Sequence, residues 1–332
     1  MKPDEKLLQV YNLSVGVQQG DRYFPAVDDI EFSMREGEIL GLVGESGCGK
    51  SMTALAIAGL LSDNLRVDSG SIVFEQQDIL HITEKEKVRL RGKDISMVFQ
   101  EPMSSLNPLM KIGKQVAEVL LLHNKRTAKE AATDVRNVLI KVGLPDPDKV
   151  MRSYPHQLSG GMQQRVMIAM AIIARPKLLI ADEPTTALDV TMQAQILDLL
   201  TSINREYKIA ILFISHDLGV VSRFCHRMAV MYAGKIVEEG TVYNIFNNPV
   251  HEYTKGLIGS IPTASSRGKP LVSIKGHVPS VFEEHLPCPF APRCLSAESR
   301  CFTEVPRRIH LNENHAINCV LAEKVSEVEY EI

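Results

Sequence analysis

The residues best suited to chemistry lie in a glycine-rich segment, GESGCGKS, at residues 44–51. Glycines let the backbone curl so that its N–H groups point at phosphate oxygens, and the helix expected to begin near Lys50 adds its positive end. Lys50 is expected to reach the β- and γ-phosphates, and the Ser51 hydroxyl to bind Mg²⁺. A glycine-rich turn without a ligand is the alternative. The predicted nucleotide contacts here are Gly44, Glu45, Ser46, Gly47, Cys48, Gly49, Lys50, Ser51 and Met52.

An acidic strand end, LLIADE at residues 178–183, supplies the groups that hydrolysis requires. Asp182 is expected to hold the metal and its water shell, and Glu183 to act as general base on the attacking water. Acidic pairs at strand ends often only cap loops, so this interpretation depends on the phosphate loop that precedes it. His216 follows the apolar run at residues 209–214 and can contact the γ-phosphate, whereas a solvated loop histidine is the alternative.

Gln100 ends an expected strand at residues 95–99 and begins a helical stretch. Its amide can reach Mg²⁺ or the attacking water, so we predict that it contributes to the metal site. Its position favours this interpretation over an ordinary surface glutamine.

A second phosphate-binding turn, LSGGMQQR at residues 158–165, opens an apolar helix. Ser159 and the N–H groups of Gly160 and Gly161 lie at the expected helix start, which is suited to an anion. Ser159 can also be an ordinary N-cap, and Gln164 is counted among the predicted nucleotide contacts. Because the first loop already provides a phosphate site, this turn predicts a half-site that a partner completes.

Composition and patterning place these motifs in a globular α/β protein. The chain has 332 residues, 45% hydrophobic and 23% charged, with a net charge of −3 and no basic block suited to nucleic acid. Its longest uncharged apolar run, residues 166–174, is too short for a membrane span, and the N-terminus reads as a mature cytoplasmic start. Expected strands lie at residues 8–17, 26–34, 39–43, 178–181, 209–214, 228–232 and 235–239, and expected helices follow Thr127, Ser159 and Val190.

Taken together, the motifs resemble the ATP-binding cassette (ABC) ATPases over roughly residues 7–245. Their order matches the family's: phosphate loop, Gln100, LSGGMQQR, Asp182-Glu183, a TALD loop at residues 186–189, and His216. The resemblance implies a P-loop NTPase core with an antiparallel β subdomain and a helical insertion at about residues 101–165. It also implies head-to-tail dimers in which each ATP lies between one phosphate loop and Ser159 to Gly161 of the partner. Phe24 is favoured as the aromatic residue on adenine, and Tyr23 also qualifies.

The remainder resembles the dipeptide/oligopeptide permease branch of ABC importers, on NPVHEYTKGLIGSIP (248–262), FQEPMSSLNP (99–108) and a cysteine-bearing tail. This implies a cassette domain at residues 1–250, a small irregular extension at 251–332, and an ATP-hydrolysing, energy-coupling role. The implied partners are a second cassette, paralogue or identical chain, two transmembrane permease subunits and an extracytoplasmic binding protein; no nucleic acid is implied. The chain would lie peripherally on the cytoplasmic face of the plasma membrane. A related nickel or glutathione importer and, more remotely, a non-transport ABC ATPase are the alternatives.

Four late cysteines, Cys288, Cys294, Cys301 and Cys319, have the spacing C-x5-C-x6-C-x17-C. Clustered thiols in a reducing compartment suit a metal better than disulfides, and members of the branch with this tail resemble carriers of a 4Fe-4S cluster. Zinc and free structural thiols are the alternatives, with His310 and His315 as possible substitute ligands. The nearby Arg293, Arg300, Arg307 and Arg308 are expected to offset thiolate charge or to form a solvated face.

Overall fold

The computed structural model describes residues 6–20, 22–123, 126–186, 188–262, 274–283 and 286–322. Their chain path divides into two compact units, each built from separate stretches. Within the described ranges, the first unit comprises residues 6–7, 34–38 and 78–214, and the second comprises residues 8–33, 39–77 and 215–322. No helix in the described part of the chain is both long and apolar enough to cross a bilayer.

Parallel strands form the sheet of the first unit: β6 (Ile95–Val98), β7 (Leu178–Asp182) and β8 (Ala210–Ser215). The pairing sets Val98 opposite Ala181 and Ala181 opposite Phe213. Every residue of β7 and β8 is buried. Their continuous apolar runs are the pattern expected of parallel strands that are covered on both faces. The sequence predicted both strands. Their carboxyl ends share one edge of the sheet, where Asp182 ends β7 and Gln100 comes shortly after β6.

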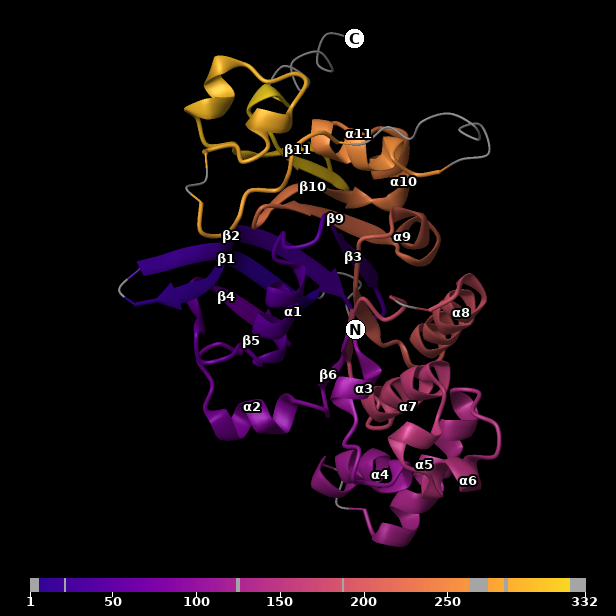
Figure 1. Ribbon diagram of the computed structural model, residues 1–332. Coiled ribbons are helices and arrows are strands. Elements are labelled where there is room, and N and C mark those ends of the chain that lie inside the picture. The colour runs from indigo at the N-terminus through magenta and orange to yellow at the C-terminus, as the bar shows by residue number, and fades with distance from the viewer. Residues whose placement is uncertain are drawn as a thin grey trace. The chain divides into compact units, whose positions relative to one another are not determined.

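Helices of the first unit pack beside one another in the stretch that the sequence predicted to be a helical insertion (Figure 1). A capping box begins α5, as predicted: the Thr127 hydroxyl accepts the Glu130 N–H, and the Glu130 carboxylate accepts the Thr127 N–H. The sequence did not resolve α4 or α2. The helices are α2 (Glu84–Leu90), α3 (Pro102–Ser105), α4 (Ile112–His123), α5 (Ala128–Lys141), α6 (Pro147–Arg152), η1 (Pro155–Gln157), α7 (Gly160–Ile172) and α8 (Val190–Tyr207).

The second unit contains the predicted antiparallel sheet, in the order β2 (Arg22–Arg35), β1 (Lys6–Gln19), β4 (Leu65–Phe74) and β5 (Gln77–Asp78). In the pairing of β1 with β4, Leu8 lies opposite Phe74 and Val17 opposite Leu65. The apolar side chains Leu8, Val10 and Phe74 are buried, so this sheet presents an apolar face to the core of the unit.

Further strands of the second unit pair in the order β11 (Arg308–Asn312), β12 (His315–Asn318), β10 (Lys235–Thr241), β9 (Arg227–Tyr232) and β3 (Ile39–Val43). β3 and β9 are parallel, and the other pairs are antiparallel. The strands expected at residues 228–232 and 235–239 pair as the hairpin of β9 and β10, but β10 does not end the sheet, because Glu238 on β10 pairs with Ile317 on β12. The late segment, residues 251–332, was expected to be a small irregular extension. Residues 307–322 of this segment contain no proline, and they include the hairpin of β11 and β12.

The helices of the second unit include α11, which lies at the start of the segment that the sequence predicted to be irregular (Figure 1). The helices are α1 (Lys50–Ala58), α9 (Leu218–Phe224), α10 (Val242–Asn247), α11 (Glu252–Gly259), η3 (Ala291–Arg293), η4 (Ser299–Phe302) and η5 (Val320–Ala322).

Candidate nucleotide site

The phosphate loop joins β3 to α1 and is closed by a lysine. The Lys50 ammonium donates to the carbonyl oxygens of Gly44 and Glu45, both at 2.9 Å, and lies 3.7 Å from the Cys48 sulfur. Lys50 is buried, so its charge is compensated by backbone dipoles rather than by water. Burial also raises the pKa of the Cys48 thiol, which therefore stays protonated near neutral pH.

Two glycines of this loop cannot be replaced by a residue that carries a Cβ atom. Gly44 has φ 156°, and a Cβ atom there would stand 2.1 Å from the Met231 carbonyl oxygen. Gly49 has φ 105°, and its Cβ would stand 2.7 Å from the carbonyl oxygen of Ala26. Such approaches are shorter than any allowed contact, so the loop depends on glycine to pass between these strands.

In the first unit, the predicted base lies in a small polar cluster at the end of β7. The Glu183 carboxylate accepts a bond from the Gln100 amide at 3.2 Å and from the Thr186 hydroxyl at 2.8 Å. Both donors bond to Oε2, which fixes the orientation of the carboxylate. The structure therefore brings Gln100 and Glu183 together, and it adds Thr186, whose place in the TALD loop was the available signal.

The backbone at Glu183 is strained, because this residue has φ 46°. Left-handed conformations are unfavourable for residues other than glycine, and they concentrate at functional sites. The conformation is fixed by a bond from the Glu183 N–H to the Ile214 carbonyl on β8, at 3.1 Å. Asp182, one residue earlier, is buried at the end of the strand, and His216 directly follows β8 and is exposed.

The predicted half-site is at the start of α7. Ser159 is the N-cap, and its hydroxyl accepts the Met162 N–H at 3.4 Å, while Ser159 and Gly160 are exposed. A Cβ at Gly161 would stand 2.3 Å from the Met192 methyl group, so this turn packs closely against α8.

Gln164 differs from the other predicted contacts because its side chain is buried. Its amide donates to the Pro184 carbonyl at 2.7 Å. This bond joins α7 to the residue that follows Glu183, a structural role that the motif alone did not reveal.

The two candidate aromatic residues for adenine have different surroundings. The Phe24 ring meets Phe282 edge to face, with centroids 5.1 Å apart. The Tyr23 ring lies under the Arg66 guanidinium, and burial raises the Tyr23 pKa to about 12. Phe282 belongs to the late segment, where no motif pointed to it.

The cysteine prediction receives no support from the geometry. Among the described residues, which include all four cysteines, no group of three or more His, Cys, Asp or Glu side chains is placed to hold a metal ion. Burial raises the pKa of Cys288 to about 11 and also raises the pKa of Cys294 and Cys319, so these thiols stay protonated. The described residues therefore give no support for the predicted cluster.

The arginine prediction is wrong for two of the four side chains. Arg293 is buried and forms an ion pair with Glu45 of the phosphate loop, and Arg308 pairs with Glu239 on β10. These carboxylates stand far away in the sequence, so only the fold reveals the pairs.

Comparison with known proteins agrees with the motifs and the fold. The family model for ABC transporters matches residues 27–186, and the model for the C-terminal region of oligopeptide/dipeptide transporters matches residues 237–301. The dipeptide transport ATP-binding protein DppD of Bacillus subtilis is 46% identical over 97% of both chains. The oligopeptide transport ATP-binding protein OppD of Salmonella typhimurium is 48% identical over 92% of this chain and 91% of its own.

Solved structures support the same conclusion. A dimeric ATP-binding cassette in a post-hydrolysis state with ADP and Pi aligns with TM-score 0.64 and 26% identity, over 71% of this chain and 98% of its own. The cassette cbiO1 from Clostridium perfringens aligns with TM-score 0.64 and 27% identity, over 74% and 92%. The chain therefore belongs to the ABC transporter ATP-binding proteins, and it is an ATPase of that class. Within the family it falls in the dipeptide/oligopeptide branch, to which both full-length relatives belong.

Proposed function

We propose that this chain is the ATP-hydrolysing, energy-coupling subunit of an importer for dipeptides or oligopeptides. The observation that carries the proposal is similarity from end to end, through the cassette and the late segment alike, to dipeptide and oligopeptide transport ATP-binding proteins. A cassette that shared only the ATPase core would not match the transporter-specific C-terminal region.

Binding of ATP is assigned to the phosphate loop. Lys50 donates to the β- and γ-phosphates in place of the loop carbonyls, and the N–H groups of the loop and of the start of α1 surround the same oxygens. Phe24 stacks on adenine, with Tyr23 as the alternative. Ser51, Gln100 and Asp182 offer the oxygen ligands that Mg²⁺ prefers, and the metal, when bound, neutralises phosphate charge.

Hydrolysis is assigned to Glu183, with Gln100 and Thr186 orienting its carboxylate. Water attacks the γ-phosphorus, its proton passes to Glu183, and the bond to the β,γ-bridging oxygen breaks to release ADP and phosphate. His216 contacts the γ-phosphate. The left-handed backbone at Glu183 holds the carboxylate in its orientation before substrate arrives, which reduces the reorganisation that the reaction requires.

A second cassette completes the site. Ser159 and Gly160 are exposed at a helix N-terminus, and an exposed anion-binding turn suits a γ-phosphate carried by a partner. Two transmembrane permease subunits and an extracytoplasmic binding protein complete the importer, on whose cytoplasmic face the chain works peripherally. The helical stretch at residues 101–165 receives the membrane subunits. An iron–sulfur cluster stays a prediction from cysteine spacing alone, and no step passes through it.

Uptake measurements in the source organism test this proposal. Deletion of the gene is expected to abolish uptake of labelled dipeptides or tripeptides, and the wild-type gene, but not the Glu183→Gln variant, is expected to restore it. Nickel and glutathione uptake in the same strains are the controls. Loss of either with intact peptide uptake would assign the chain to a related importer, and no change in any of the three would favour a non-transport role.

A further inference from the structure

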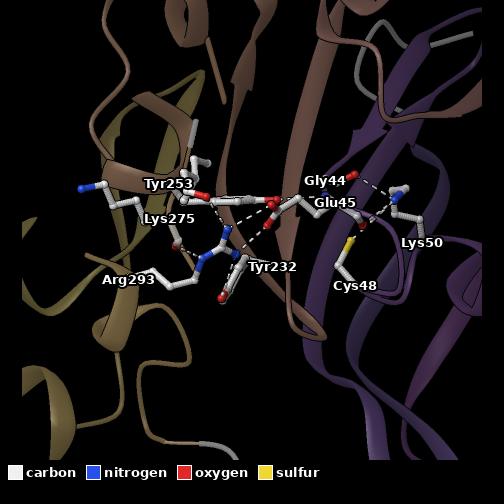
Figure 2. Close-up of polar contacts among 9 residues, drawn as sticks. Gly44, Glu45, Cys48, Lys50, Tyr232, Tyr253, Lys275 and Arg293 are labelled. Atoms are coloured by element: carbon white, nitrogen blue, oxygen red, sulfur yellow. Dashed lines mark hydrogen bonds and ion pairs between the residues drawn. The ribbon is translucent and has the colours of Figure 1, made fainter. Parts of the chain in front are cut away.

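An arginine of the late segment, Arg293, forms an ion pair with Glu45 of the phosphate loop. The Arg293 guanidinium donates to both oxygens of Glu45, at 2.7 Å to Oε2 and 3.1 Å to Oε1 (Figure 2). This is a bidentate fork, the strongest geometry for such a pair. Only 5% of the Arg293 side chain and 32% of the Glu45 side chain are exposed, so solvent screens this pair less than it screens a pair on the surface. The bond to Glu45 raises the pKa of Arg293, which stays charged at any relevant pH.

The guanidinium is itself fixed from several sides. Its Nε donates to the Lys275 carbonyl at 2.9 Å, and its two terminal nitrogens also reach the Tyr232 hydroxyl at 3.3 Å and the Ile274 carbonyl at 3.4 Å (Figure 2). Its Cζ atom lies 5.6 Å from the centroid of the Tyr232 ring and 6.0 Å from the centroid of the Phe290 ring. Its donors are therefore satisfied and its orientation is set, as a side chain that positions another group requires.

Glu45, the second residue of the phosphate loop, is held at three points. Arg293 binds its carboxylate, the Tyr253 hydroxyl accepts its backbone N–H at 2.9 Å, and Lys50 donates to its carbonyl oxygen at 2.9 Å. Tyr253 lies on α11 and is fully buried. Two of these three bonds come from the late segment, and the third comes from the lysine assigned to the ATP phosphates.

Charge gives the arrangement a second effect. A carboxylate in a phosphate-binding loop repels the phosphate anion, and the repulsion is strong where the surroundings are poorly solvated. Arg293 neutralises this charge where it stands. Without Arg293 the carboxylate would be uncompensated and the loop would lose one of its three anchors.

We propose that Arg293 is a positioning residue for ATP binding, which fixes and neutralises Glu45 so that the phosphate loop is ready for its ligand. This inference rests on the proposed function, since it takes residues 44–51 to bind ATP. It gives the late segment a part in nucleotide affinity, whereas a segment that only braced the fold would affect stability alone.

The test measures the ATP Kd and the steady-state kcat and KM of the purified full-length chain, together with its melting temperature. Arg293→Ala is expected to weaken ATP binding by about tenfold, the size of a typical coupling between sites, with kcat at saturating ATP little changed. Arg293→Lys keeps the charge but loses the fork, so its Kd should fall between those of the wild type and Arg293→Ala.

A double-mutant cycle with Glu45→Gln isolates the pair. In the Glu45→Gln background, Arg293→Ala should change the Kd far less than it does with the carboxylate present. Equal effects in both backgrounds, or a folded Arg293→Ala with wild-type Kd, would overturn the inference. If Arg293→Ala does not fold, the same measurements are made on Arg293→Lys. A wild-type Kd for Arg293→Lys, both with and without the Glu45→Gln substitution, would also contradict the inference.

Arg308→Ala is the matched control. Arg308 also joins the late segment to the rest of its unit through a carboxylate, Glu239, and through the Glu31 carbonyl, but these bonds do not involve the phosphate loop. This variant should lower the melting temperature and leave the ATP Kd unchanged. A wild-type chain that binds no ATP would instead refute the proposed function, so the two failures are distinct.

Discussion

Glu183 combines three properties that suit a general base. It follows a buried strand, its carboxylate is oriented by Gln100 and Thr186, and its backbone is strained into the left-handed region. Strain of this kind persists only when the surroundings enforce it. Here a bond from the Glu183 N–H to β8 provides the enforcement.

Replacing Glu183 by glutamine should therefore remove the chemistry and keep the site. We expect turnover to fall by about 10²- to 10⁴-fold, the usual contribution of a general base, with ATP binding intact. A phosphate-release assay and an ATP-binding assay measure the two effects. Glu206→Gln, at an exposed ion pair with Lys141 in the same unit, is the control and should hydrolyse ATP normally. Normal turnover in Glu183→Gln would remove this residue as the base.

At this scale the sequence predicts residues that stand together in a motif and misses those brought together by the fold. Lys50, Ser51 and the glycines are consecutive, so their types and spacing reveal the loop. Arg293 lies 248 positions from Glu45, among scattered arginines of the kind that usually form a solvated face. No local pattern separates an arginine that pairs with the loop from one that does not.

Among the elements, α11 begins at a histidine in an unusual state. The His251 ring is buried, and its Nδ1 accepts the Tyr253 N–H at 3.1 Å. Burial lowers the pKa of His251 from 6.5 to about 4, while Glu238 and Glu252 act to raise it and Lys255 to lower it. The neutral ring is thus the form that caps the helix.

This histidine should make the fold sensitive to mild acid. Because the folded pKa is below the unfolded one, the unfolded chain binds the proton more readily between pH 6.5 and about 4. The contribution of neutral His251 to the free energy of unfolding is fully present above that window. It is lost as the pH is lowered through the window, by about 3 kcal/mol at most. Melting temperatures at pH 7.5 and 5.0 measure the loss.

His251→Gln should flatten the pH dependence of the melting temperature between these two values, because glutamine does not titrate. His310→Gln, at an exposed position on β11, should keep the wild-type slope. An unchanged slope in His251→Gln would show that other groups control the acid response.

The sequence identified elements with strong local signals and missed those that depend on partners. The capping box of α5 and the apolar runs of β7 and β8 are local, and the structure has all three. The strand β12 has four residues and owes its conformation to pairing with β10. The many prolines of the late segment predicted irregular structure. A local pattern of this kind does not show that β12 will form by pairing with a strand far away in the sequence.

For the whole molecule, the exposed turn at Ser159 leads us to propose that function requires a second cassette. Ser159→Arg is expected to abolish ATP hydrolysis because a bulky cation would occupy the place of the partner's γ-phosphate. Binding of ATP to the variant's own phosphate loop should persist. Equilibrium binding and phosphate release measure the two properties, and Ser202→Arg, at an exposed position on α8, serves as a surface control. Loss of binding in Ser159→Arg would contradict a site shared between two chains.

The bond between Gln164 and Pro184 connects the two roles that one chain has in such a pair. The helix α7, which begins at the proposed half-site, is joined within the same unit to Pro184, the residue after the proposed base Glu183. In the proposed dimer we therefore expect the two ATP molecules to be coupled, because a shift of α7 beside one of them would be transmitted through this bond to Glu183 beside the other. The velocity should then rise with ATP more steeply than a hyperbola, with a Hill coefficient above one, and weakening this bond should bring the curve back toward a hyperbola.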